Sequence, residues 1–397
     1  MKKHFLIVLP ACLWLVIAIL GSSCHHRLSL PGDVSDRRDW VSAAGSAGRR
    51  DFSSERLVFP LELRWKASAR GPIVASPTVI GELICVGTLG RRFSCFSAGD
   101  GRRHDAMKTD AGVSATAAFG EGTVFLATES GEGIVRALDF EEGDIRWETP
   151  VGDVSAALTY CRGRILVSTN QGRLCCLAAE DGSRMWQFST RGRKSTAVTV
   201  SEDMAVCGCD DGYLYALGID DGVERWSRQL EGAVWAAPVA DDGRIYAGTF
   251  GGYLYCLAAD DGAIIWRQDT EGNITRPLAL GPETVFAGTD RGTLLAMARR
   301  NGQLRWTYRL SDARPGAPVA TADALLVGDS DGRILALNVD DGTLLWSYQT
   351  GRAIVSAPVM RKGRLFVGSM NGYLYAFAPA DSGAASHTSN RMMPSGP

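Results

Sequence analysis

Histidine is scarce in this sequence, with 5 in 397 residues, and the formal net charge is only −2. Four of the histidines, at positions 4, 25, 26 and 387, lie outside the internal repeats and leave His104 alone. Metal ligation therefore has little support, and no serine or cysteine nucleophile lies in an elbow motif with a partner histidine. No basic domain is present. The sequence predicts neither catalysis, nor a bound metal or cofactor, nor nucleic-acid binding.

A long apolar run is present only at the N-terminus. Two lysines after Met1, an apolar stretch over residues 5–20 and small residues before Cys24 are typical of an export signal. The sixteen apolar residues contain Pro10 and fall short of the roughly 20 that a membrane-spanning helix needs, although an uncleaved anchor stays possible. We interpret residues 1–24 as a signal sequence.

The residues before Cys24 resemble the lipobox of bacterial lipoproteins, in which the cysteine is acylated. The match is imperfect because Leu20 lies four residues before the cysteine, and the family pattern places leucine three before it. We expect lipidation at Cys24 and a location on the periplasmic side of the outer membrane, with plain secretion or an N-terminal anchor as alternatives. Residues 25–60 are interpreted as a polar tether and lead-in, and residues 381–397 as a disordered tail.

Tryptophan recurs at a fixed period through the rest of the chain. The spacing is 39 and then 40 residues, at Trp147, Trp186, Trp226, Trp266, Trp306 and Trp346. Each follows a turn glycine by four residues, and Asp105 and His387 take the tryptophan position at the two degenerate ends. Four short apolar runs separated by Gly/Asp turns fill each unit, which is the pattern of one propeller blade. Residues 61–380 are therefore predicted to form an all-β, eight-bladed β-propeller.

Small residues recur in two columns of the repeat. The second-strand column holds Gly87, Ala127, Ser168, Gly208, Gly248, Gly288, Gly328 and Gly368. The third-strand column holds Cys95, Ala137, Cys176, Ala216, Cys256, Ala296, Ala336 and Ala376. Both columns should let neighbouring sheets approach closely. The last repeat lacks a fourth strand, and a spare strand over residues 61–67, with Trp65, is expected to close the ring and protect its edge.

The repeat resembles the PQQ-type propeller repeat, as in the unit that ends at Trp266. WD40 repeats are disfavoured because no aspartate follows the key tryptophans. Among PQQ-repeat proteins, the length and the lipoprotein-like signal most resemble the BamB family of outer-membrane protein assembly lipoproteins. The resemblance implies a non-catalytic scaffold that binds protein partners, such as a subunit that assembles outer-membrane β-barrels, and that has a lipid anchor at the membrane.

The resemblance also implies a docking loop. The aligned stretch here is Phe188, Ser189, Thr190, Arg191 and Gly192. Ser189, Arg191 and Gly192 match the family pattern, Phe188 is an apolar replacement, and Thr190 differs from the pattern. In the next loop, Ala233 and Trp235 stand where the family has two acidic residues.

Two other functions stay open. A PQQ-dependent oxidoreductase would need a cofactor chamber, but the repeats of about 40 residues carry no insertion that could build one. Cys175 and Cys176 are adjacent, as in the vicinal disulfide of such enzymes, yet both fit ordinary strand columns. An envelope sensor that binds a glycan or peptide is the third possibility.

The remaining cysteines and the aspartate turns have simple interpretations. Cys95, Cys207 and Cys256 share columns with small apolar residues, so we expect cysteine to act mostly as a small apolar residue. Export permits disulfides, and the pairing stays open. The Asp-Asp-Gly turns at residues 220, 260 and 340 lack the spacing of a calcium loop and are explained by turn chemistry.

The two faces of the ring should differ in charge. The Gly turns before the outer strands carry many acids, so that side is called the acidic face. The loops that lead into the innermost strands form the opposite side, here called the cationic face, and carry Arg70, Arg191, Arg193, Lys194, Arg276, Arg314 and Arg352. These cations, with an exposed Trp235, are predicted to bind an anionic partner, although acids on the same loops also fit a mixed solvated rim.

Overall fold

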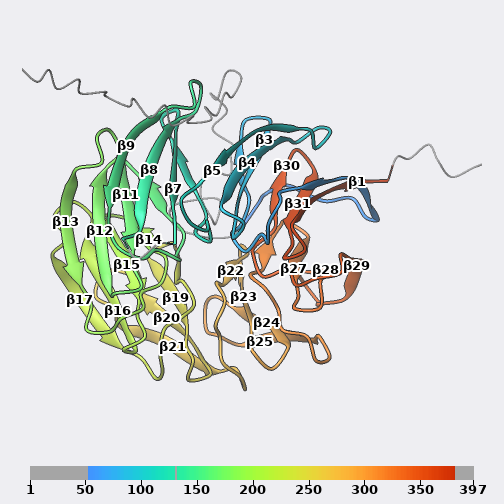
Figure 1. The fold of residues 1–397 in the computed structure, drawn as a ribbon. Helices are drawn as coiled ribbons and strands as arrows, with labels where there is room; N and C mark the ends of the chain where they lie inside the picture. The colour runs from blue at the N-terminus through green and yellow to red at the C-terminus, as the bar shows by residue number, and fades with distance from the viewer. Residues whose placement is uncertain (1–51, 130–131, 381–397) are drawn as a thin grey trace, which may run out of the picture.

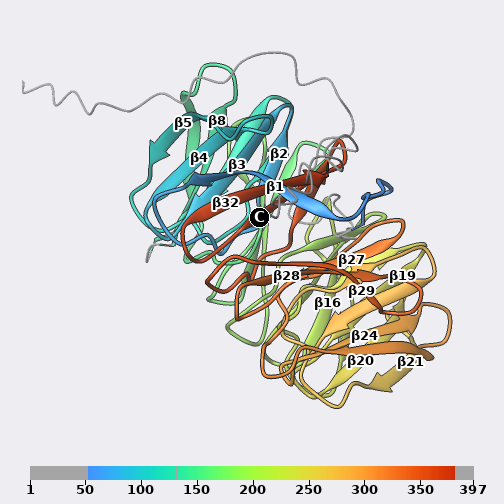
Figure 2. The same ribbon diagram turned by 90° about the vertical axis from the view of Figure 1, so that its right-hand side faces the viewer.

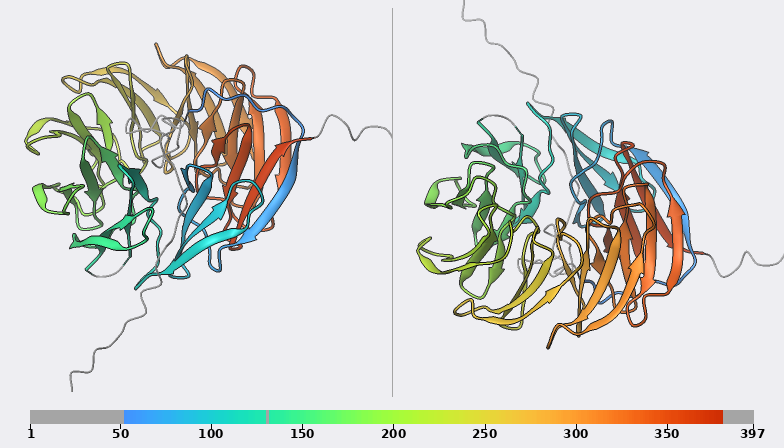
Figure 3. Two further views of the ribbon diagram at one scale, coloured as in Figure 1. Left: turned by 90° about the horizontal axis from the view of Figure 1, so that it is seen from above. Right: turned by 90° about the horizontal axis from the view of Figure 1, so that it is seen from below.

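Eight four-stranded antiparallel sheets make up the fold, and they follow one another in chain order around a central axis (Figure 1; Figure 3). The computed structural model describes residues 52–129 and 132–380, where the secondary structure is entirely strand. Cys24, the predicted signal and the tail after residue 380 lie outside this described part. The prediction of an all-β, eight-bladed propeller is confirmed.

The strands are short, and each blade runs from the innermost to the outermost strand. Blades one to four comprise β2 (Thr78–Ile80), β3 (Leu83–Thr88), β4 (Arg92–Ser97), β5 (Arg103–Lys108); β6 (Ala118–Gly120), β7 (Thr123–Ala127), β8 (Ile134–Asp139), β9 (Ile145–Pro150); β10 (Thr159–Cys161), β11 (Arg164–Ser168), β12 (Arg173–Ala178), β13 (Arg184–Ser189); and β14 (Thr199–Ser201), β15 (Met204–Gly208), β16 (Tyr213–Gly218), β17 (Glu224–Gln229). Blades five to eight comprise β18 (Val239–Asp241), β19 (Arg244–Gly248), β20 (Tyr253–Ala258), β21 (Ile264–Asp269); β22 (Ala279–Leu280), β23 (Thr284–Gly288), β24 (Thr293–Ala298), β25 (Leu304–Arg309); β26 (Val319–Ala320), β27 (Ala324–Gly328), β28 (Arg333–Asn338), β29 (Leu344–Gln349); and β30 (Val359–Arg361), β31 (Arg364–Gly368), β32 (Tyr373–Pro379) with β1 (Leu61–Ser68).

The N-terminal strand β1 closes the ring, as predicted. It pairs antiparallel with β32 at the outside of blade eight, and Figure 2 shows the two strands side by side. Trp65 faces Ala376 in this ladder, as Trp186 faces Cys176 in blade three. The first and last strands of the propeller therefore share one sheet, which pairs the edge that β32 would otherwise expose.

Each repeated tryptophan joins its blade to the next one. The Trp186 ring lies against Gly222, where an added Cβ would come within 2.6 Å of it, and the indole nitrogen donates to the Ile219 carbonyl at 2.9 Å. The same pair of contacts links Trp65 to Gly101 and to the Ala98 carbonyl. A glycine is needed because any side chain would displace the ring.

The second-strand column is small because the following loop packs on it. A Cβ at Gly208 would lie 2.2 Å from the Val234 side chain, and one at Gly328 would lie 2.1 Å from that of Ile354. The close approach predicted from this column is confirmed. Most of the core is accordingly divided among the interfaces between neighbouring blades; one cluster joins Phe125 and Trp147 to Leu177.

One cysteine prediction was wrong. Cys95 was expected to act as a small apolar residue, but it is bonded to Cys85 in the structure. The two cysteines face each other directly across β3 and β4, so the antiparallel register brings their sulfurs together. Cys175 and Cys176 are buried free thiols.

The interface between blades one and two lacks the tryptophan link because Asp105 occupies that position opposite Cys95. An ionic link is found there instead. The buried Arg136 of β8 donates to Asp110, which follows blade one, at 2.7 Å, and also to Glu148 on β9. Arg136 therefore connects the two blades through charge-assisted hydrogen bonds.

The described part of the lead-in packs against the last two blades. Phe52 forms a parallel bridge with Ala320, Leu57 is buried, and Glu55 accepts hydrogen bonds from the backbone of Lys362 and Gly363. Within the ranges 52–129 and 132–380, no helix is long and apolar enough to cross a membrane.

Candidate partner-binding site

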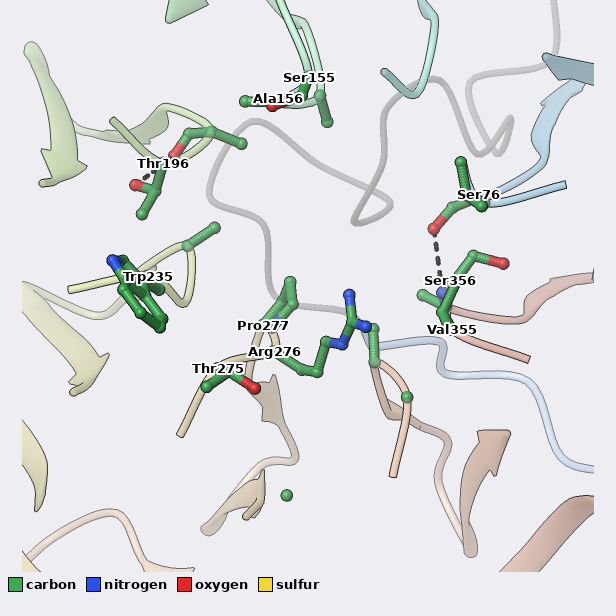
Figure 4. A pocket seen from close by; sticks show the side chains of 18 of the residues that line it. Ser76, Ser155, Ala156, Thr196, Trp235, Thr275, Arg276, Pro277, Val355 and Ser356 are labelled. Carbon is green, nitrogen blue, oxygen red and sulfur yellow. Dashed lines mark hydrogen bonds between the residues drawn. The ribbon is translucent and has the colours of Figure 1, made fainter. Parts of the chain in front are cut away.

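A ring of small residues surrounds the mouth of the central channel on the cationic face. The third residue before the innermost strand is small in seven blades, at Ala75, Ala115, Ala156, Thr196, Ala236, Gly316 and Ser356. Blade six has Arg276 at this position. Figure 4 shows its guanidinium projecting from the wall into the cavity, between Trp235 on one side and Val355 with Ser356 on the other.

The Arg276 guanidinium has no hydrogen-bond or ion-pair partner within the described part of the chain. The residue as a whole is exposed to solvent. Burial by the surrounding wall nevertheless lowers the pKa of the guanidinium from its usual value, although arginine remains charged at neutral pH. An unpaired cation in such a site favours an anion that can replace the lost water.

An aromatic pair lies on the wall next to blade six. The ring centroids of Trp235 and Phe250 are 4.3 Å apart, and the two side chains are 41% and 42% exposed. Trp235 comes from the loop before β18, and Phe250 from the turn after β19. That turn is fixed by a hydrogen bond from the Phe250 backbone N–H to the Ala233 carbonyl. The predicted exposure of Trp235 at the channel mouth is thus observed, and its neighbour was not anticipated.

These groups line one cavity of about 730 Å³. It brings together four of the predicted site residues, Lys194, Trp235, Arg276 and Arg314. The carboxylate of Asp290 also lines it, but that group accepts two hydrogen bonds from Asn273. The remaining wall is mostly small apolar and hydroxyl-bearing residues, so the cavity carries an excess of positive charge.

The predicted docking loop lies at the outer side of this mouth and is held by its own blade and the next. The backbone N–H groups of Gly192 and Arg193 donate to Asp211 and Asp210 of blade four. The hydroxyl of Thr190, which differs from the family pattern, donates to the carbonyls of Gly172 and Gly192. The loop conformation is therefore defined by hydrogen bonds that leave the basic side chains free.

Side chains of the docking loop have different surroundings. Arg191 lies over the Tyr213 ring at 4.7 Å, and Phe188 is half-buried against Tyr215. Ser189, at the end of β13, is exposed. Arg191 and Arg193 thus extend the positive surface outward from the channel.

Acids on the same loops do not neutralise these cations. Asp153 accepts from Asn170, and Glu231 is paired with Arg267. Among the residues that the structure describes, none of the predicted cations has an ion-pair partner; these are Arg70, Arg191, Arg193, Lys194, Arg276, Arg314 and Arg352. Glu271 and Asp312 on these loops are exposed as well, so the rim carries both signs of charge, and the excess of positive charge is found in the cavity.

The structure does not bring every predicted residue to the channel. Arg70 lines a separate cleft between blades one and two, and Arg352 is exposed outside the channel lining.

Phe250 was not predicted as a site residue, although the sequence contains a signal for it. Phe250 lies two residues after the second-strand column, at a position where an aromatic residue is unusual. Five other blades have a polar residue there, at Glu129, Asn170, Asp210, Asp290 and Ser330.

The cavity residues do not fit a metal-bound quinone cofactor. A quinoprotein site would need a metal ion and a carboxylate base, whereas Asp290 is the one acidic side chain in the described lining. Nor do the described residues contain a cluster of three or more His, Cys, Asp or Glu side chains able to hold a metal. The adjacent Cys175 and Cys176 lie within a blade and not in the channel lining.

The repeats and the ring define the class of the protein as a PQQ-repeat β-propeller. The family model described as outer membrane protein assembly factor BamB matches residues 61–157, 131–237 and 210–396. The chain belongs to this family. A curated relative, the outer membrane protein assembly factor BamB of Burkholderia pseudomallei (strain K96243), is 30% identical over 164 residues, or 36% of this chain and 43% of that protein. The match thus spans less than half the length of the relative.

Solved structures share the fold at low sequence identity. BamB from Moraxella catarrhalis superposes with a TM-score of 0.71 and 19% identity, over 80% of this chain and all of that one. Quinohemoprotein alcohol dehydrogenase from Comamonas testosteroni gives 0.73 and 14%, over 88% of this chain and 82% of that one. At such identities the likeness concerns the fold alone.

Proposed function

We propose that the protein is a non-catalytic scaffold of the bacterial cell envelope that works in outer-membrane protein assembly and binds a protein partner through its cationic face. The observation that carries this proposal is the set of unpaired cations beside the exposed Trp235. Family membership supplies the context of outer-membrane assembly.

The two faces differ in how their charges are used. On the acidic face, carboxylates cap their own turns: Asp181 accepts from the backbone of Ser183, and Asp221 from that of Val223. On the cationic face, the arginines and the lysine are exposed, and no acceptor for their head groups is found within residues 52–129 and 132–380. Positive charges of this kind steer an acidic partner during encounter, while an exposed tryptophan supplies the area of a binding hot spot.

The position of the protein in the envelope is part of the proposal. We place it on the periplasmic side of the outer membrane, held by an acyl group on Cys24. Mass spectrometry of the mature protein tests this, because acylation predicts an N-terminus at Cys24 that carries lipid mass. A mature chain that retains residues 1–23 would contradict it.

Site-specific photocrosslinking tests the binding face. A photoreactive amino acid at Ser189 should capture a subunit of the β-barrel assembly machinery in intact envelopes. Glu180 provides the matched control, because it is also exposed and lies on the β12–β13 hairpin near the opposite face. A crosslink to that subunit from Glu180 but not from Ser189 would contradict the proposed face. No crosslink to that subunit from either position would contradict the proposed partner.

The rival quinoprotein function has a direct test. Purified protein is mixed with PQQ and calcium, and the cofactor absorbance and dye reduction with an alcohol are recorded. The scaffold function predicts no change in either measurement. Dye reduction above that of the protein-free mixture would overturn it.

A further inference from the structure

The cavity at the channel mouth combines two features whose recessed position the binding of a flat partner surface does not explain. A single guanidinium projects into it from a position that is small in every other blade, and an exposed aromatic pair lies on the adjacent wall. Both are set inside the ring and not on its outer rim.

We propose that the channel mouth is a binding site for an acidic peptide segment, whose carboxylate pairs with Arg276 and whose neighbouring apolar side chain packs on Trp235 and Phe250. The proposal rests on the proposed function only in taking the ligand to be part of a protein. It deepens that function, because an extended segment of the partner would enter the ring through the cavity that Trp235 and Arg276 line.

Charge selects the carboxylate. Lys194, Arg276 and Arg314 line the cavity and have no ion-pair partner within residues 52–129 and 132–380. The acid in the lining, Asp290, is already engaged by two hydrogen bonds from Asn273. A planar guanidinium matches a carboxylate through two parallel hydrogen bonds.

The aromatic pair selects an apolar neighbour of that carboxylate. Trp235 and Phe250 are each about two-fifths exposed although their rings are only 4.3 Å apart. Their free faces would be covered by an aromatic or aliphatic side chain. Because they line the same cavity as Arg276, one short segment can satisfy both.

The arrangement of the cations favours a peptide over a free organic acid. The cavity of about 730 Å³ is large enough for a small ligand, but its basic residues continue outward through Arg193 and Arg191 along the docking loop. A small acid in the cavity can reach only the basic residues of the lining, Lys194, Arg276 and Arg314. An extended acidic segment can also engage the basic residues outside the cavity.

Peptide binding to the full mature protein tests the proposal by fluorescence anisotropy. The probe is a labelled, end-blocked hexapeptide that alternates glutamate and phenylalanine, and the comparison peptide replaces each glutamate by glutamine. We expect the glutamate peptide to bind at least tenfold more tightly, and Arg276→Gln to reduce its affinity about tenfold or more. Arg300→Gln is the matched control, an exposed arginine on the β24–β25 turn of the acidic face and outside the cavity lining, and should change affinity no more than two- to threefold.

Each alternative result has a distinct meaning. Equal affinity for the two peptides, or an unaltered affinity in Arg276→Gln, would overturn the site. Phenylacetate and unlabelled peptide are each used to displace the labelled peptide. If phenylacetate does so at the same molar concentration as the unlabelled peptide, the choice of a peptide as ligand is overturned. Thermal unfolding of Arg276→Gln should match the wild type, because the side chain has no internal partner in the described structure. Crosslinking from Ser189 is measured separately, so failure of this site and failure of the proposed function are distinguishable.

Discussion

Trp65 stands opposite Ala376 in the ladder between β1 and β32, and its ring lies over Gly101 of blade one. One side chain near the start of the propeller thus holds its last blade to its first. The same arrangement recurs at Trp147, Trp186, Trp226, Trp266 and Trp306, but the Trp65 contact joins the two ends of the propeller.

Replacing Trp65 by alanine should weaken the closure of the ring. We expect a loss of about 3 kcal/mol in the free energy of unfolding, because the change removes a large packed ring and its hydrogen bond to Ala98. Chemical denaturation followed by circular dichroism measures it. Leu63→Ala on the same strand, an exposed position, is the control and should cost well under 1 kcal/mol. Equal losses in the two variants would argue against the tryptophan link.

The disulfide between Cys85 and Cys95 should contribute measurably to stability. Its loop of 10 residues predicts a loss of about 2–3 kcal/mol on reduction, mainly from the greater freedom of the unfolded chain. Denaturation with and without a reductant tests this. The double variant Cys85→Ala, Cys95→Ala should be insensitive to reductant, and Cys256→Ala, which removes a free thiol, should remain sensitive. Reductant sensitivity of the double variant would contradict the pairing.

Trp235 is predicted to be a binding hot spot with little structural role. Trp235→Ala should weaken binding of the protein partner by about 2 kcal/mol, or roughly 30-fold in Kd. Titration calorimetry with the purified partner gives the value. Trp226→Ala is the contrasting variant, because that ring is buried against Gly262 and its loss should reduce stability. An unaltered affinity in Trp235→Ala would remove the aromatic pair from the interface.

The charges of the cationic face, and the salt that screens them, should act mainly on the rate at which the protein partner associates. Arg193→Glu is expected to slow association several-fold at low ionic strength, and the difference should shrink as salt screens the charges. Arg162→Glu provides the control, because its exposed guanidinium already pairs with Asp203 on another part of the surface. Surface plasmon resonance at several salt concentrations measures both variants. A salt-independent rate would contradict steering by the cationic face.

The ionic link between blades one and two should make stability depend on acid pH. Burial alone would raise the pKa of Asp110, but the hydrogen bond and charge of Arg136 outweigh it and lower that pKa. A carboxyl group with a lowered folded-state pKa contributes stability above its unfolded value, and the contribution is lost as pH falls through the folded value. The loss should therefore begin near pH 4 and continue below it.

Arg136→Gln tests this assignment. Its free energy of unfolding should be lower than that of the wild type at pH 7, and the difference should narrow as Asp110 becomes protonated below pH 4. Arg146→Gln breaks an exposed pair with Asp139 within blade two and should have a smaller effect at pH 7. A constant difference between Arg136→Gln and the wild type from pH 7 to pH 3 would contradict the ionic link.

Much of the fold can be predicted from the sequence because each local pattern occurs in up to eight copies, which can be compared with one another. A column such as Gly208, Gly248 and Gly288 indicates close packing without any knowledge of the neighbour. The disulfide could not be predicted in this way, because Cys95 fits the small column as well as alanine does. Only the register that places Cys85 opposite it decides the pairing.

The candidate site was predicted less completely, because side chains from different blades meet there. Trp235 and Arg276 stand out within their loops as large residues at positions that are otherwise mostly small. Phe250 lies in another loop, and its contact with Trp235 depends on the turn that the Ala233 carbonyl fixes. Charges were visible in the sequence, but whether a given arginine is paired or free depends on the acids that surround it in space.

The sequence by itself determined the number of blades, the closing strand and the small columns, because these follow from a periodic pattern of local preferences. Only the tertiary structure decided that Arg136 links blade two to the blade that lacks a tryptophan. It also decided that Arg276, which has no ion-pair partner in the described part of the chain, shares a cavity with Trp235 and Phe250. Both outcomes depend on distances between residues far apart in the chain, which the closed ring sets and the local sequence does not encode.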